Sequence, residues 1–199
     1  MTIDRRQFLG ASVAATVCLA TPRAFAAPRS AVRPPLLPQA LSALDTHRSS
    51  ITQRSVLGMV DFSARSNAMR FQLVDIASGR IAASWLVAHG RGSDPDNSGW
   101  LERFSNRPGS NASSRGSFLI ANSYVGKHGR SRRLIGLDPE NNLAFERAIV
   151  IHGAQYVDRD MALQSGRVGR SLGCFAVETR EIGEVLARLA PGSLLFASK

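Results

Sequence analysis

The stretch GRSLGCFAV, residues 169–177, contains the one cysteine of the chain that lies beyond residue 18. Cys174 follows a glycine and begins a short apolar run that is typical of a β-strand. A second strand-like run, IVIHGA at residues 149–154, carries His152 near its end. If these two strands lie together in one sheet, a thiol and an imidazole come side by side, which is the arrangement that Cys/His acyl transfer requires.

Similar short runs of Val, Ile, Leu and Phe, separated by Gly, Asn, Asp and Ser, continue along the chain from residue 55. This pattern predicts a mainly β domain with mostly antiparallel strands. Residues 39–53 and 182–189 have apolar residues at helical spacing instead, so we expect one or two short helices. With 199 residues, the chain is long enough for one domain and too short for two ordinary ones.

Residues 1–26 have the features of an export leader. Arg5 and Arg6 precede an apolar run, and small residues around Ala26 favour cleavage there. The pattern resembles twin-arginine signals, and the apolar run is only about half the length that spans a bilayer. We therefore expect cleavage and no integral membrane span, an uncleaved anchor being the alternative. Residues 27–54 then form a Pro/Ala-rich tether and a short helix before the main domain, residues 55–199.

The leader and the charge restrict the partners. We expect an exported protein, in the periplasm or cell wall of a bacterium. The net charge of the full chain is +10, and removal of a leader with three arginines and one aspartate leaves +8. Arg130, Arg132 and Arg133 could form a nucleic-acid patch, but an exported protein rarely meets nucleic acid. A solvated basic face, or attraction to an anionic wall polymer, is the expected reason for the charge, and we expect a monomer.

Cys174 is the only thiol after leader removal, so it is buried and inert, paired with another molecule, or reactive. A reactive thiol needs a base or a cation, because a free cysteine has a pKa of about 8.5. His152 is the best candidate base, since a strand end would hold its ring rigidly. Gly173 permits an unusual backbone angle and lets the N–H groups of Gly173 and Cys174 point at a developing oxyanion. The His and Cys spacings match no regular metal motif, so we expect no metal.

These two stretches resemble the active-site signature of the YkuD-like L,D-transpeptidases, in which a His-Gly pair is followed by Ser/Thr-x-Gly-Cys. Residues 123–157, SYVGKHGRSRRLIGLDPENNLAFERAIVIHGAQYV, resemble the murein L,D-transpeptidase catalytic-domain branch of that family. Most members carry His before the Gly-Cys pair and Arg or Asn two positions after the cysteine. This chain has Leu172 and Ala176 at those positions. The likeness extends over about residues 55–196 and implies a β-sandwich or barrel catalytic domain.

The resemblance implies an enzyme that acts on peptidoglycan stem peptides without any cofactor. Cys174 would attack the bond between the L-centre of a diamino acid and D-Ala, His152 would act as base, and a carbonyl near Gly153 would orient the imidazole. D-Ala leaves, a thioester forms, and an amine acceptor resolves it. Further expected substrate-binding residues are Arg170 for a carboxylate, Ser171 at the turn, and Tyr124, Lys127 and His128 on the acceptor side.

Two other functions use the same sequence features. A thiol-dependent L,D-carboxypeptidase or amidase would share every catalytic residue and release stem or wall-linked products. A non-catalytic wall-binding module would be a decayed enzyme, with Leu172 and Ala176 as marks of the loss. Residues 90–117 have few apolar side chains and many turn formers, so this segment is either one wall of a cleft or a surface loop without a role.

Overall fold

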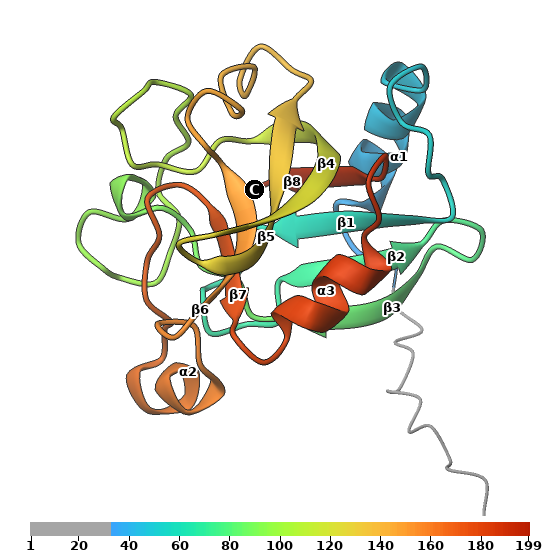
Figure 1. Ribbon diagram of the computed structural model, residues 1–199. Coiled ribbons are helices and arrows are strands. Elements are labelled where there is room, and N and C mark those ends of the chain that lie inside the picture. The colour runs from blue at the N-terminus through green and yellow to red at the C-terminus, as the bar shows by residue number, and fades with distance from the viewer. Residues whose placement is uncertain (1–32) are drawn as a thin grey trace, which may run out of the picture.

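A computed structural model describes residues 33–199, and the predicted leader and the first part of the tether lie outside them (Figure 1). The helices are α1 (Leu37–Thr46), α2 (Arg159–Ser165) and α3 (Ile182–Arg188), with a short 3-10 turn at Arg91–Ser93. The strands are β1 (Val56–Asp61), β2 (Phe71–Asp75), β3 (Arg80–Trp85), β4 (Gly116–Gly126), β5 (Gly129–Gly136), β6 (Val150–Ala154), β7 (Phe175–Glu178) and β8 (Leu194–Ser198). The predicted mainly β class is confirmed.

The eight strands form one mixed sheet in the order β3-β2-β1-β8-β4-β5-β6-β7. The pairs β1·β8 and β6·β7 are parallel and the other five are antiparallel. The sheet curls, because the chain that follows edge strand β3 returns to the other edge: Ala88 bridges Ala176 of β7, and Gly90 bridges Ser171. This near-closure agrees with the expected sandwich or barrel.

The curled sheet encloses the main core, to which every strand contributes residues, including Phe71, Trp85, Phe118 and Phe175, and to which Phe62 adds directly after β1. A second apolar cluster lies on the outer face under α1 (blue in Figure 1), where Leu37, Ala40 and Leu44 are buried. Burial of each such leucine contributes about 1.5–3 kcal/mol. The predicted first helix therefore packs on the sheet, and the boundary at residues 54–55 stays a prediction.

Three α-helices lie among residues 33–199, one more than the largest number expected. The additional helix is α2, whose short sequence RDMALQS contains little apolar periodicity. Local capping defines it: the Asp158 side chain accepts from the Met161 N–H at 2.9 Å, and Gly166 ends it in the left-handed conformation. No helix in this part of the chain is long and apolar enough to cross a membrane.

Candidate active site

Strand register brings Cys174 and His152 to one face of the sheet. In the parallel pair β6·β7, Ile151 is opposite Phe175 and His152 is opposite Ala176. Ile151 and Phe175 belong to the main core. Because side chains alternate along a strand, His152 and the residue just before Phe175, which is Cys174, project to the opposite, outer face. The thiol and the imidazole therefore lie over adjacent strands, as the sequence predicts.

A cavity of about 450 Å³ lies over this face. Seven of the nine predicted site residues line it, namely Tyr124, Lys127, His128, His152, Arg170, Ser171 and Cys174. The other two, Gly153 and Gly173, act through the backbone next to it. Six further residues line the same cavity and were not expected from the sequence: Arg133, Arg147, Ala148, Val150, Tyr156 and Leu172.

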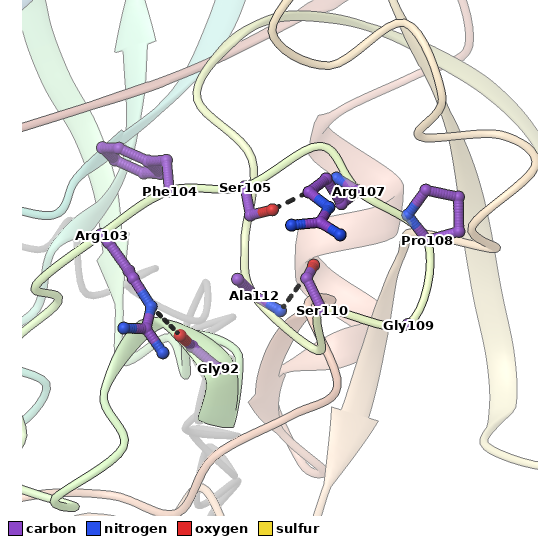
Figure 2. Close-up of a pocket in the computed structure, with 9 residues that line it drawn as sticks. All are labelled: Gly92, Arg103, Phe104, Ser105, Arg107, Pro108, Gly109, Ser110 and Ala112. Carbon is purple, nitrogen blue, oxygen red and sulfur yellow. Dashed lines mark hydrogen bonds between the residues drawn. The ribbon is translucent and has the colours of Figure 1, made fainter.

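A second hollow, of about 470 Å³, lies within the loop that contains residues 103–112 (Figure 2). Arg103 donates there to the Gly92 carbonyl at 3.0 Å, and Arg107 points into the hollow. None of the predicted site residues lines this hollow, and it contains neither a thiol nor an imidazole. The groups able to carry acyl transfer are therefore in the cavity at Cys174.

The imidazole of His152 is held in one tautomer. Its Nδ1 lies 2.9 Å from the Gly153 carbonyl oxygen, which can only accept, so Nδ1 carries the proton and Nε2 is the basic nitrogen. Burial lowers the pKa of His152, and the charges of His128 and Lys127 lower it further, against the effect of the Gly153 hydrogen bond. The His128 ring, at the tip between β4 and β5, stacks on His152 with 4.3 Å between centroids. The His152 imidazole is thus neutral at neutral pH.

Cys174 is a thiol rather than a thiolate in the resting structure. Burial raises its pKa, although the Val150 N–H and the charges of Arg147 and Lys127 oppose this effect. Within residues 33–199 the thiol donates to the Ala148 carbonyl oxygen at 3.7 Å. A proton transfer from this thiol to the imidazole would require the sulfur to exchange this partner.

A tight turn positions Cys174. Gly173 has φ +117°, and its N–H donates to the Ser171 hydroxyl at 3.1 Å, while that hydroxyl donates to the Cys174 carbonyl at 2.7 Å. The expectation that Ser171 supports the turn agrees with these bonds. The Gly173 N–H, expected to face an oxyanion, is instead used inside the turn.

Two arginines of the cavity donate hydrogen bonds to the loop at residues 90–115. Arg170, expected to bind a substrate carboxylate, donates to the Asp94 and Pro95 carbonyls, the second at 3.1 Å. Arg147 donates to four oxygens of the loop, at 2.6–3.3 Å; they belong to Ser105, Ser110, Ala112 and Ser114. The loop is therefore anchored to two side chains of the cavity, but none of its own residues lines that cavity. No motif around Arg147 signals this role.

A buried polar network supports the loop at residues 90–115. His89 is 1% exposed, and its Nδ1 accepts from Arg70 at 2.8 Å while its Nε2 donates to Asp94 at 3.1 Å. Burial and the adjacent Arg70 lower the pKa of His89 to about 4. The His89 carbonyl accepts from the Ser171 N–H at 2.9 Å, so the network is connected to the turn that carries Cys174.

The two departures from the common signature occupy different environments. Leu172 is 56% exposed at the rim of the cavity. Ala176 is fully buried, because the segment after β3 pairs with it and the Ala88 N–H donates to its carbonyl at 2.9 Å. That covering segment explains why a small residue stands at position 176.

The chain matches the family described as L,D-transpeptidase catalytic domain over residues 29–198, and it belongs to that family. The expected family is thereby confirmed. Comparison with curated protein sequences gives no match.

Solved structures similar to this chain include an L,D-transpeptidase from Mycobacterium smegmatis, with 13% identity, 73% of this chain and 59% of that chain covered, and a TM-score of 0.45. An L,D-transpeptidase from Mycobacterium tuberculosis H37Rv has 11% identity and a TM-score of 0.45, with 73% of this chain and 58% of that chain covered. An L,D-transpeptidase from Xylanimonas cellulosilytica has 17% identity and a TM-score of 0.44, with 81% of this chain and 70% of that chain covered. The chain thus spans less than two thirds of the two mycobacterial chains.

Proposed function

We propose that this protein is an exported peptidoglycan L,D-transpeptidase with Cys174 as nucleophile and His152 as base. The observation that carries the proposal is the pairing of a thiol with an imidazole of fixed tautomer on adjacent strands, over one cavity. The substrate class follows from membership of the L,D-transpeptidase family. A substrate in the cell wall requires export, for which the sequence of residues 1–26 is suited.

In the proposed first half-reaction, the Cys174 sulfur attacks the carbonyl carbon of the L-centre that precedes D-Ala. His152 Nε2 takes the thiol proton as the carbon–sulfur bond forms. The tetrahedral intermediate then expels D-Ala, whose nitrogen receives the proton from His152, and a thioester remains. A neutral Cys174 thiol and a neutral His152 imidazole suit this order, because the imidazole can accept the proton when the attack begins.

In the second half-reaction, an acceptor amine attacks the thioester and gives a proton to His152. The new amide bond forms, the carbon–sulfur bond breaks, and the proton returns to the Cys174 sulfur. Lys127, His128 and Tyr124 come from the hairpin β4·β5 and are the proposed acceptor side. The positive charges of Lys127 and Arg147 oppose the raised pKa of Cys174 and so help the sulfur leave as a thiolate.

Intact-protein mass spectrometry after mixing with a purified tetrapeptide stem tests this function. The wild type should gain the mass of a tripeptidyl group and release D-Ala, whereas Cys174→Ala should gain none. A stem that ends in L-Ala is the matched substrate control. Transfer to an added amine gives a cross-linked or exchanged product. A bare tripeptide alone would indicate the carboxypeptidase instead, and binding without any adduct or D-Ala would indicate the wall-binding module.

A further inference from the structure

Arg133 contacts two aromatic rings. Its guanidinium carbon lies 5.1 Å from the ring centroid of Tyr124 on β4 and 5.2 Å from that of Phe145, in the connection between β5 and β6. Each such contact is favourable, and two of them together restrict the positions that the guanidinium can take. Phe145 is 51% exposed, so the contact with Arg133 gives this large apolar side chain a function on the surface.

This arrangement leaves the hydrogen-bond donors of Arg133 available. A contact with an aromatic ring uses the positive charge of a guanidinium and leaves its N–H donors unpaired. Within residues 33–199, no carbonyl or carboxylate oxygen accepts a hydrogen bond from Arg133, whereas Arg147 and Arg170 of the same cavity donate to loop oxygens. Arg133 is therefore the cavity arginine whose planar pair of donors is free for a ligand.

Register places this arginine close to the nucleophile. Arg133 on β5 is opposite Val150 on β6, and the Val150 N–H is directed at the Cys174 sulfur from the neighbouring strand. Two interstrand spacings amount to about 10 Å between the backbones, a distance that an arginine side chain and one substrate residue bridge together. No aspartate or glutamate lines the cavity. A ligand group bound here should be an anion of planar shape.

We propose that Arg133, oriented by Tyr124 and Phe145, binds a carboxylate of the substrate beside the bond that Cys174 attacks. Paired N–H donors of a guanidinium match the two oxygens of a carboxylate. The inference rests on the proposed function, since that function supplies the peptide substrate. Two carboxylates of the stem carry this chemistry: the one at the terminal D-Ala and the one on the side chain of the diamino acid.

Three tetrapeptide stems distinguish them: the parent, a C-terminal amide, and an amide of the side-chain carboxylate. We expect Arg133→Gln to lower kcat/KM for the parent by roughly 10- to 100-fold, mainly through KM, because a charge-assisted pair is lost. On the amide that lacks the recognised carboxylate, wild type and Arg133→Gln should have equal kcat/KM. Arg130 is an exposed arginine of the same strand that lies outside the cavity, so Arg130→Gln is the matched control. It should leave kcat/KM unchanged for all three stems.

Phe145→Leu tests the orientation, because it removes one ring and leaves the arginine. It should weaken the preference for the carboxylate stem, with an unchanged melting temperature. If Arg133→Gln lowers activity equally on all three stems, or on none, the inference is wrong. Calorimetric binding of the stems to Cys174→Ala makes the test independent of turnover. An Arg133-dependent preference there would support the inference even if wild type transfers nothing, a result that would overturn only the proposed function.

Discussion

Replacement of Gly173 by alanine tests whether close packing holds the nucleophile turn. An added Cβ would lie 2.7 Å from the Ala112 carbonyl oxygen and 3.0 Å from the Ile149 side chain. The φ of +117° costs an L-residue about 1–3 kcal/mol, and the overlap adds about 1–3 kcal/mol, as in overpacked cores. The oxygen cannot simply move away, because Arg147 donates to it at 2.6 Å. We therefore expect Gly173→Ala to lower the free energy of unfolding by about 2–6 kcal/mol.

Gly109→Ala is the matched control, because Gly109 has φ +74° and no atom lies within 4 Å of the position of its added Cβ. It should cost only the backbone strain, about 1–2 kcal/mol. Urea unfolding with equal m-values measures both differences. At a temperature where both variants are folded, a displacement of Cys174 by about 1 Å should reduce kcat by roughly 100-fold in Gly173→Ala alone. Equal unfolding midpoints for the two variants would refute the packing argument.

Three further outcomes are expected. Lys127→Gln removes a charge that lowers the pKa of His152, so the acid limb of the kcat/KM profile should move to higher pH; a limb that moves down would contradict the assignment of the base. Between pH 6.5 and 4 the unfolded chain binds more protons at His89 than the folded chain does, because the folded pKa is about 4. The free energy of unfolding should fall by about 3 kcal/mol from pH 7 to 4 through this group, and His89→Gln should show a smaller fall in urea titrations at each pH. Ala148 has φ +55°, so Ala148→Gly should raise the free energy of unfolding by about 1 kcal/mol and raise the urea midpoint with it. An unchanged midpoint would mean that the strain is absent.

Much of the fold and the two central side chains could be predicted from local sequence. Alternation and turn residues identify strands one at a time, and a histidine before a glycine or a cysteine after one is visible without any tertiary knowledge. The pairing of β6 with β7 then brings His152 and Cys174 together, as expected. The missed helix α2 shows the limit of periodicity, since Asp158 and Gly166 define its ends more strongly than its apolar residues do.

The functions of neighbouring arginines could not be predicted. Arg132 and Arg133 are adjacent in one basic run, yet a shift of one residue along a strand moves a side chain to the other face of the sheet. Arg132 is 7% exposed and donates to the Ser123 hydroxyl and the Leu189 carbonyl. Arg133 lines the cavity and contacts two aromatic rings. Only the register of β5 distinguishes a structural arginine from one that can bind a ligand.

The loop at residues 90–115 shows why a count of apolar residues gave two alternatives. Its order comes from buried polar groups, since Asp94, Ser113 and Ser114 are fully buried and hydrogen-bonded. Such groups stabilise only when every partner is present. Because His89 accepts from Arg70 only as a neutral ring, the order of this loop depends on pH through His89, whereas the proposed chemistry depends on pH through His152. The two dependences have separate origins, and His89→Gln should remove the first while the acid limb assigned to His152 remains.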